Sequence, residues 1–321
     1  MKKDKITIIL LNWNGKKDTL ECLASLQKLT YSNYEILLVD NGSSDDSIAS
    51  FQKEFPSLPI IQTFSNLGYA GGNNAGVDHA LARGADYILL LNNDTIVSSD
   101  LLDRFMESAK KQPQAGLFGG KILSYKEPKL IDHLGGNWNP RIGEFVSIGK
   151  GKDISFFTDM QKVDYVSGCA LFIKREVIEK IGKLDPRFFL LWEETDFCYR
   201  ARSAGFEIWS VPSALVWHKI SASFSGKALM HYYWWRNRLL WIEKNLPWKE
   251  KKRLYFKVIL KDIFKIYKHF ALKSLQYFFL KLFSPSQLNE RKKAALKRYR
   301  AGCLGIRHYI LRKFGGPITI K

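Results

Sequence analysis

The chain has 321 residues and a formal net charge of +19 at pH 7. This length can bury one large domain, alone or with an appendage. Four scattered cysteines without a Cys-x-x-Cys pair argue against a zinc ribbon or a disulfide framework and fit a reducing cytosol. No stretch reaches 18 uncharged apolar residues, so the sequence predicts no membrane-spanning helix.

The positive charge is concentrated in the last third of the chain. Residues 221–321 contain 24 Lys or Arg and 4 Asp or Glu, whereas residues 1–220 contain 26 Lys or Arg and 27 Asp or Glu. We therefore predict a near-neutral domain at 1–225, followed by a basic, aromatic-rich helical region at 226–321.

Strand and helix patterns alternate through the first 125 residues. Short apolar runs predict strands, and apolar residues at helical spacing predict helices. In chain order the predicted elements are a strand at 6–11, a helix at 16–29, a strand at 34–40, a helix at 45–55, a strand at 58–64, a helix at 69–83, a strand at 87–92, a helix at 100–112 and a strand at 116–123. This alternation predicts an α/β fold, a doubly wound sheet with helices on both faces.

The segment 124–165 interrupts this alternation with several glycines and Pro140, which indicates hairpins and a loop beside the functional site. After it the sequence predicts a strand at 163–174, helices at 175–181 and 194–203, and a strand at 206–211. From Gly226 the pattern is helical to nearly the end.

The predicted strand at 87–92 ends in the polar triplet Asn92-Asn93-Asp94. Open α/β sheets bind ligands at the carboxyl ends of their strands. A hard divalent cation takes one or two carboxylates and completes its shell with phosphate oxygens and water. Asp94 is therefore a candidate ligand for Mn²⁺ or Mg²⁺ on a diphosphate, and the alternative is a plain cap for the next helix.

Two further segments fit a nucleotide. Asp40 ends the second predicted strand, where a carboxylate can accept a hydrogen bond from a ribose hydroxyl or a pyrimidine N–H; the alternative is a cap in a common turn. The segment Asn66–Gly76 is rich in glycine and amide residues beside a helix start, which suits close approach of a phosphate. It matches neither the P-loop nor the dinucleotide fingerprint, and a structural loop is the alternative.

The acidic cluster Glu193-Glu194-Thr195-Asp196 follows Trp192 and begins a predicted helix. Like charges close together raise a pKa, which suits a general base; the alternative is an acidic first turn that stabilises the helix dipole. His218 follows an apolar stretch, and its imidazole suits manganese better than magnesium. A lone histidine beside a tryptophan also fits a purely structural role.

The basic region contains a lysine stripe on an apolar helix. Lys257, Lys261, Lys265 and Lys268 recur at spacings of four, four and three residues among bulky aliphatic and aromatic residues. This pattern predicts a helix that lies in the plane of an anionic membrane surface. The alternatives are a solvated face of a packed helix and a nucleic-acid patch, which the narrowness of the stripe disfavours.

Taken together, the motifs resemble the family 2 glycosyltransferases of the GT-A fold, a Rossmann-like mixed and mainly parallel sheet, and especially the bacterial rhamnosyltransferase-like branch. The resemblance covers roughly residues 5–245. The matching pieces, in the family's order, are residues 9–15, 39–43, the 66–76 loop, 91–94, 167–170 and 188–200.

The resemblance implies a role for each candidate residue. Glu194 would be the catalytic base, and Asp94 and His218 the metal ligands. The remaining candidates are Asn12, Asp40, Gly71, Gly72, Asn73 and Asn93 for the donor, and Gly168, Trp192, Glu193 and Asp196 for the acceptor or for orientation. Two departures stand out: Asn92 replaces the first acid of the family's Asp-x-Asp motif, and a glutamate replaces the expected aspartate base.

The function that this resemblance implies is that of a metal-dependent inverting glycosyltransferase. The expected donor is dTDP-L-rhamnose, with UDP sugars next, and the expected acceptor is a glycan or a lipid-linked glycan for cell-surface polysaccharide. The expected place is the cytoplasmic face of the cell membrane, with no nucleic-acid partner. The alternatives are a non-catalytic nucleotide-sugar or carbohydrate-binding module and a basic nucleic-acid-binding protein.

Overall fold

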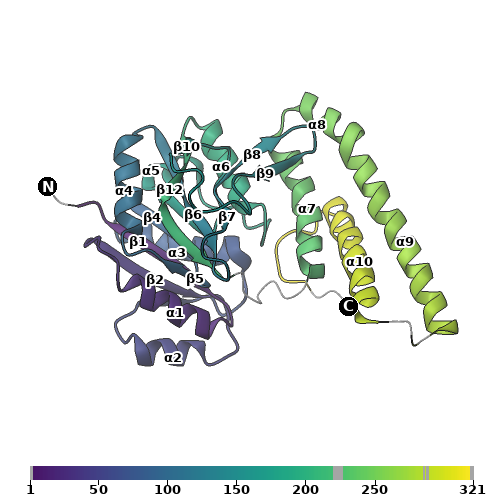
Figure 1. Ribbon diagram of the computed structural model, residues 1–321, viewed down its shortest axis with the longest axis horizontal. Helices are drawn as coiled ribbons and strands as arrows, with labels where there is room; N and C mark the ends of the chain where they lie inside the picture. Colours follow the sequence, from purple (N-terminus) through teal and green to yellow (C-terminus); the bar gives the residue numbers. More distant parts are fainter. Residues whose placement is uncertain (1–2, 220–226, 285, 287–288, 319–321) are drawn as a thin grey trace.

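The computed structural model describes residues 3–219, 227–284, 286 and 289–318. An α/β domain occupies one side of the molecule, and the C-terminal helices form a separate layer against its other side (Figure 1). The predicted domain boundary at 225/226 falls at residues outside the described part of the chain.

The central sheet has ten strands within the described residues. Its main path runs β10-β12-β6-β11-β4-β1-β2-β3, while β5 pairs with β12 and β7 pairs with β6. The strands are β1 (Ile6–Asn12), β2 (Tyr34–Asp40), β3 (Ile60–Gln62), β4 (Tyr87–Asn92), β5 (Thr95–Val97), β6 (Ala115–Ser124), β7 (Ile131–His133), β10 (Gln161–Lys162), β11 (Ala170–Lys174) and β12 (Glu207–His218). A separate hairpin consists of β8 (Gly136–Asn139) and β9 (Glu144–Ser147).

The sheet is mixed. Strands β3, β2, β1 and β4 are parallel to one another, and β12 is parallel to β6. Strand β11 lies antiparallel between β4 and β6. The chain order changes direction between β1 and β4, so their carboxyl ends border the crevice where open α/β sheets bind ligands.

Helices cover both faces of the sheet, as the sequence predicts. They are α1 (Lys16–Leu26), α2 (Ser47–Glu54), α3 (Gly68–Ala82), α4 (Leu101–Lys111), α5 (Arg175–Ile181) and α6 (Glu193–Ser203). Alternate residues of β1 point to opposite faces: Ile8 and Leu10 pack into one apolar core with residues of α1 and α4, and Ile9 packs into the other with residues of α3, α5 and α6.

Three strand predictions need correction. β5 was not predicted, although its sequence Thr-Ile-Val is β-branched, because three residues give no measurable period. β12 extends to His218, seven residues beyond its predicted end at Val211, because Leu215–His218 continue the pairing with β6 after a register shift. β11 begins at Ala170 rather than Val163, since 163–169 is irregular.

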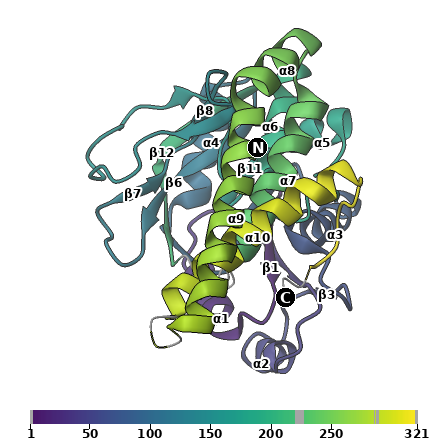
Figure 2. The same ribbon diagram turned by 90° about the vertical axis from the view of Figure 1, so that its right-hand side faces the viewer.

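The C-terminal region is helical, as predicted. It contains α7 (Lys227–Asn245), α8 (Trp248–Leu254), a π-helical turn (Tyr255–Ile259), α9 (Leu260–Phe283) and α10 (Glu290–Ile310). α7 and α10 pack together, and α9 runs beside α10 at the outer side of the layer (Figures 1 and 2). No helix among the described residues is long and apolar enough to cross a membrane.

An aromatic cluster joins this layer to the α/β domain. Trp241 of α7 stacks near Trp138 of the β8–β9 hairpin, with 4.5 Å between the ring centroids, and it also contacts Phe145 and Trp192. Burying such large aromatic side chains contributes strongly to stability. The helical region is therefore packed onto the domain that carries the candidate site.

Candidate active site

The carboxyl ends of β1 and β2 are fastened by the Asn12 side chain. Its amide donates to Asp40 Oδ1 at 2.9 Å and to Ser43 Oγ at 3.0 Å, and its carbonyl oxygen accepts from Thr19 Oγ1 at 2.9 Å and more weakly from Asn93 Nδ2 at 3.3 Å. Asn12 and Asp40 are both buried. The structure gives these two predicted donor residues a role in shaping the crevice, and their direct contact with a donor stays a prediction.

The predicted metal ligands Asp94 and His218 lie together. His218 Nε2 is 3.2 Å from Asp94 Oδ1 because β12 pairs with β5, which places His218 opposite Thr95, the residue after Asp94. The other ring nitrogen, Nδ1, faces Asp132 Oδ2 at 4.0 Å. A carboxylate behind a metal-binding imidazole orients the ring and raises its basicity.

The charges around His218 change its protonation. Burial alone would lower the pKa of the imidazole, but Asp132 and Asp94 outweigh it and raise the pKa to about 9. The nearby His218 lowers the pKa of Asp132. The protonated ring therefore neutralises the carboxylates, a role that a divalent cation would take over.

Asp94 and His218 suit a divalent cation only in part on their own. No complete cluster of three His, Cys, Asp or Glu side chains arranged for a metal is present in the part of the chain that the structure describes. One carboxylate and one imidazole form an incomplete set that diphosphate oxygens and water would complete, as they usually do for Mg²⁺ and Mn²⁺. The residues thus fit a cation that binds together with its nucleotide.

A cavity of about 410 Å³ opens beside Asp94. Asn93 and Asp94 line it together with Trp13, an exposed aromatic side chain that follows β1. The remaining lining residues are Leu11, Asn41, Asn66, Gly68, Tyr69, Asn92, Phe189, Leu190, Leu229, Tyr233, Pro317 and Ile318. We call this space the donor cavity, because aromatic, amide and acidic groups converge in it.

The predicted glycine-rich segment lies mostly inside α3 and behind this cavity. A Cβ at Gly72 would lie 2.4 Å from Leu11 Cδ1, so this glycine allows the helix to pack closely on β1. Asn73 is buried and donates to the carbonyl oxygen of Tyr69. Gly71, Gly72 and Asn73 are not among the residues that line the donor cavity, and their role in donor binding remains a prediction. Gly68 does line it, with a φ of 72°.

The acidic cluster follows a strained turn. Phe189, Leu191 and Trp192 have φ values of 64°, 69° and 77°, a region that bulky residues rarely adopt. Trp192 occupies the N-cap position of α6, so Glu193 and Glu194 lie in its first turn. Strained backbone of this kind clusters at functional sites.

The environment separates the two glutamates chemically. Burial and the charge of Glu194 raise the pKa of Glu193 well above its ordinary value. Burial also raises the pKa of Glu194, but backbone hydrogen bonds of the first turn lower it in part. Glu193 therefore holds a proton more firmly than Glu194, as in other sites where two carboxyl groups divide the work.

Both glutamates keep an unused oxygen. Glu193 Oε2 and Glu194 Oε2 are buried and have no hydrogen-bond partner within the described residues. Glu194 lines a second cavity of about 170 Å³, whose other walls are Glu144, Phe145, Tyr165, Leu191, Trp192, Thr195 and Trp234. A buried acceptor without a partner is costly unless a ligand or water satisfies it. Glu194 thus brings a buried carboxylate to the wall of the second cavity, and its role as the base stays a prediction.

Tyr69 lies in the donor cavity within the electrostatic influence of the acidic cluster. Burial and then the charges of Glu193 and Glu194 raise its pKa. Its hydroxyl donates to the carbonyl oxygen of Gly168 at 2.6 Å, and a Cβ at Gly168 would lie 2.7 Å from that hydroxyl. Gly168 was a candidate for orientation, and the structure shows that the tyrosine needs its lack of a side chain.

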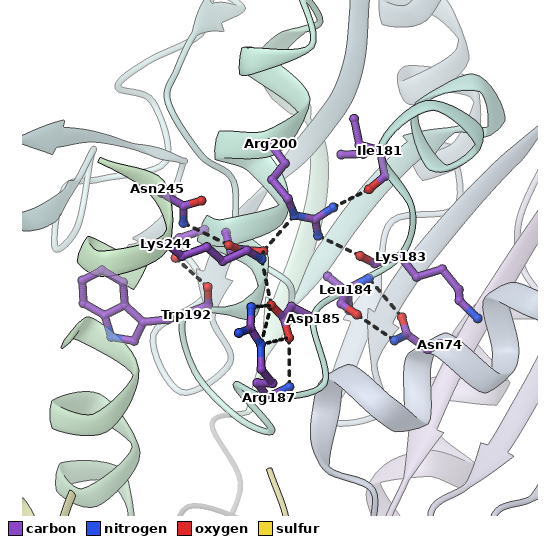
Figure 3. A network of polar contacts seen from close by, with 12 residues as sticks. Asn74, Ile181, Lys183, Leu184, Asp185, Arg187, Trp192, Arg200, Lys244 and Asn245 are labelled. Carbon is purple, nitrogen blue, oxygen red and sulfur yellow. Dashed lines mark hydrogen bonds and ion pairs between the residues drawn. The ribbon is translucent and has the colours of Figure 1, made fainter. Parts of the chain in front are cut away.

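Asp196 is fully engaged elsewhere. Arg200 and Lys244 donate to its Oδ2 at 2.9 and 2.8 Å, and Asn245 donates to Oδ1 at 2.9 Å (Figure 3). Lys244 also bonds Asp185, at 2.8 Å. Asp196 therefore ties α6 to α7, and of the three acids it is the one whose carboxylate is saturated by cations.

Sequence reasoning missed Asp132, which lies in β7, a strand of three residues inside the irregular segment 124–165. It also missed Trp13 and the residues Pro317 and Ile318 in the wall of the donor cavity. Trp13 directly follows Asn12 in a segment that the resemblance already covered, so its position was the available signal.

Residues 7–182 match the glycosyl transferase family 2. The chain belongs to this family. It is 26% identical over 211 residues to the low-salt glycan biosynthesis hexosyltransferase Agl10 of Haloferax volcanii, a match that covers 64% of this chain and 64% of that protein. It is 25% identical over 279 residues to an N-acetylglucosaminyl-diphospho-decaprenol L-rhamnosyltransferase of Mycobacterium tuberculosis, covering 74% of this chain and 89% of the relative.

Solved structures confirm the GT-A fold predicted from the resemblance. A mannosyltransferase of Pyrobaculum calidifontis, in complex with GDP-mannose and Mn²⁺, superposes with a TM-score of 0.60 at 12% identity, over 97% of this chain and 88% of that one. GalNAc-T7 with UDP, GalNAc and Mn²⁺ superposes with a TM-score of 0.61 at 14% identity, over 96% of this chain and 56% of that chain. The fold of this glycosyltransferase is thus a mixed, mainly parallel sheet covered by helices, with further helices at the C-terminal end.

Proposed function

We propose that this glycosyltransferase is a metal-dependent inverting enzyme that transfers L-rhamnose from dTDP-L-rhamnose, with UDP sugars as the next candidates. The observation that carries the proposal is the pairing of two chemically different sites. Asp94 and His218 provide a cation site at the donor cavity, and Glu194 offers a buried carboxylate oxygen without a partner in the second cavity. The similarity to the mycobacterial rhamnosyltransferase supports the sugar.

Asp94 and His218 would hold the cation, and Mn²⁺ is favoured over Mg²⁺ by the imidazole ligand. When bound, the cation supplies Lewis-acid stabilisation of the departing diphosphate. Asp132 keeps the His218 ring oriented. Trp13 in the cavity wall offers stacking to the nucleoside, and the Asn66 amide offers a hydrogen bond.

Glu194 would act as the general base. It accepts the proton of the acceptor hydroxyl while that oxygen attacks the anomeric carbon from the face opposite the diphosphate, which inverts the configuration. The carbon–oxygen bond to the diphosphate breaks in the same step. Glu193 stays protonated beside it, because its raised pKa avoids a second buried charge.

The second cavity gives the acceptor a route. It shares Glu144, Leu191 and Trp234 with a larger cavity of about 510 Å³ between α7, α9 and α10. Aromatic walls of this kind suit the apolar faces of sugars. We propose a glycan or a lipid-linked glycan as the acceptor, which the name of the mycobacterial relative supports.

We also propose that α9 rests on an anionic membrane surface. Leu260, Phe264, Tyr267, Leu275, Phe278 and Leu282 recur at helical spacing, and each is 42–68% exposed. By helical geometry Lys261, Lys265 and Lys268 flank one side of this apolar stripe, and all three are exposed. An apolar stripe beside lysines fits the boundary of lipid headgroups. Such a surface would bring a lipid-linked acceptor to the larger cavity.

A melting screen of nucleotide sugars with and without Mn²⁺ tests the donor and the cation together. Stabilisation by dTDP-L-rhamnose that depends on Mn²⁺ is expected, since a ligand of the native state raises the melting temperature. Slow release of dTDP without added acceptor would separate an enzyme from a non-catalytic binding module. No Mn²⁺-dependent stabilisation by any nucleotide sugar would refute the proposed site.

A further inference from the structure

The strained turn that precedes the acidic cluster is held by hydrogen bonds from two helices, α7 and α3. Its left-handed residues Phe189, Leu191 and Trp192 each carry a backbone conformation that bulky side chains rarely adopt. Such a conformation persists only when the surroundings determine it fully. The groups that hold the turn therefore decide where Glu193 and Glu194 point.

The principal holding groups come from α7. The side-chain amide of Asn237 lies 2.8 Å from the carbonyl oxygen of Phe188, 2.8 Å from that of Leu190 and 2.7 Å from that of Leu191. An amide has two N–H groups, so these three short contacts share them. Asn237 is completely buried, and its side chain spends all its donors on this one turn.

Arg236 completes the arrangement. Its Nη2 donates to the carbonyl oxygens of Arg187 and Phe188 at 3.1 and 2.7 Å, and its Nε donates to Asn237 Oδ1 at 2.9 Å. The bond from Nε fixes the orientation of the Asn237 amide. Arg236 is also fully buried, although it carries a charge, and its guanidinium contacts carbonyl oxygens and the faces of the Tyr232 and Tyr233 rings.

The opposite side of the turn contacts α3. The backbone N–H of Tyr69 donates to the carbonyl oxygen of Phe189 at 2.7 Å, and a Cβ at Gly68 would lie 2.3 Å from that oxygen. The turn is thus clamped between the helix that borders the donor cavity and a helix of the C-terminal layer. Its four carbonyl groups at 187, 188, 190 and 191 face α7, and that at 189 faces α3.

We propose that Arg236 and Asn237 are positioning residues for the proposed reaction: they hold the left-handed turn 188–192 so that the Glu194 carboxylate faces the second cavity. The inference rests on Glu194 being the base. A buried pair that only stabilised the fold would not need to converge on the one turn that is both strained and next to the reacting carboxylate.

Turnover after substitution of Asn237 tests this. Asn237→Ala removes both amide donors, and a misplacement of about 1 Å costs about 10²-fold in rate. We expect kcat for dTDP-L-rhamnose consumption to fall by about that factor, with a smaller change in the Kd for dTDP and Mn²⁺, because Asp94 and Trp13 are not touched although Phe189 and Leu190 of the turn border the donor cavity. Arg236→Lys, which keeps the charge but loses the fork, should give a smaller loss in the same direction.

A matched control separates positioning from stability. Lys121 is likewise buried and donates to two loop carbonyl oxygens, those of Ile154 and Phe156 at 2.8 and 3.2 Å. Lys121→Met should lower the melting temperature while kcat stays close to wild type. An equal loss of kcat in this control at equal loss of stability would show that destabilisation alone explains the effect.

A double-mutant cycle gives the decisive readout. If Asn237 acts through Glu194, adding Asn237→Ala to Glu194→Gln should cost little more than Glu194→Gln alone. Full additivity, or an undiminished kcat in the folded Asn237→Ala variant, would overturn the proposal. Should that variant not fold, Arg236→Lys takes its place in the cycle. Full activity of Glu194→Gln itself would instead refute the proposed base, which is a separate outcome.

Discussion

His218 Nε2 lies 3.2 Å from Asp94 Oδ1, although the two residues come from the ends of different strands. The contact exists because β5, which directly follows Asp94, pairs antiparallel with the end of β12. A strand of three residues therefore assembles the cation site that the proposed mechanism needs.

Asp94→Asn should lower turnover by about 10²-fold or more. Loss of a Lewis acid forfeits several kcal/mol, and each 1.36 kcal/mol is a factor of ten in rate. Isothermal titration of dTDP with and without Mn²⁺ should show that the variant loses the metal-dependent part of binding. The control is Asp78→Asn, which removes a surface ion pair between Asp78 of α3 and Lys183. Undiminished turnover of Asp94→Asn would remove this residue from the site.

Glu194→Gln should retain donor binding and lose about 10²–10⁴-fold in rate, the usual range for a general base. Glu193→Gln should be much milder, because burial and the charge of Glu194 favour the neutral form of Glu193, and glutamine is neutral as well. The comparison is made by dTDP release on the two purified variants. The opposite ranking would shift the assignment of the base by one residue.

His133 makes the free energy of unfolding depend on pH. Burial lowers its pKa from 6.5 to about 4, and its Nδ1 accepts from the backbone N–H of Gly135 while Nε2 bonds the Tyr165 hydroxyl at 2.8 Å. Between pH 6.5 and 4 the unfolded chain binds a proton that the folded chain does not. Stability is therefore complete above pH 6.5 and declines as the pH falls, by at most about 3 kcal/mol.

Urea denaturation of wild type and His133→Gln across this pH range measures the effect. The difference between the two proteins should change with pH only in that window, since glutamine does not titrate. A difference that is constant from pH 7 to pH 4 would contradict a buried neutral imidazole.

Vesicle binding by α9 and the π-helical turn before it should depend in part on Lys257, Lys261 and Lys268. Changing all three to Gln should release the protein from phosphatidylglycerol vesicles, at roughly 1 kcal/mol per lysine near the surface. Lys265 is left in place because it borders the larger cavity. Added salt should weaken wild-type binding too, since the Debye length is about 10 Å at 0.1 M. Turnover of a short soluble acceptor should survive the change.

Vesicle flotation and soluble-acceptor turnover are measured on the same triple variant. Flotation equal to wild type would mean that the lysines are a solvated face. Lost soluble turnover would mean that this part of α9 shapes the active site. A pull-down with a single-stranded oligonucleotide distinguishes lipid binding from the nucleic-acid alternative.

The alternating strands and helices of the first half were predictable because buried parallel strands and amphipathic helices have clear periods. The position of Asp94 was predictable for the same reason, since it comes just after the end of the apolar strand β4. Asp132 was not, because β7 lies in a segment without periodicity and its position depends on pairing with β6. The strand pairing that brings Asp132 to His218 belongs to the tertiary structure.

Arg236 and Asn237 show a different limit of the sequence. In a chain with 50 Lys and Arg, a basic residue in an aromatic helix indicates a solvated face, whereas this arginine is completely buried. Its burial depends on carbonyl groups that the strained turn exposes, and no local pattern signals a left-handed Phe, Leu or Trp. For Gly72 the sequence suggested a phosphate loop, and the structure adds a packing role in the close approach of α3 to β1, while its role in donor binding stays a prediction.

The hydrogen bonds from α7 to the turn 188–192 have a consequence for how the chain can be divided. A fragment that stops at the apparent boundary after residue 225 would keep the cation ligands and the acidic residues yet lose Arg236, Asn237 and the Trp241 contacts. The fragment would also lose Leu229, Tyr233, Pro317 and Ile318 from the wall of the donor cavity, so both nucleotide binding and transfer should suffer. The C-terminal layer is in this sense no exchangeable module, and grafting it from another glycosyltransferase would require its turn to be exchanged as well.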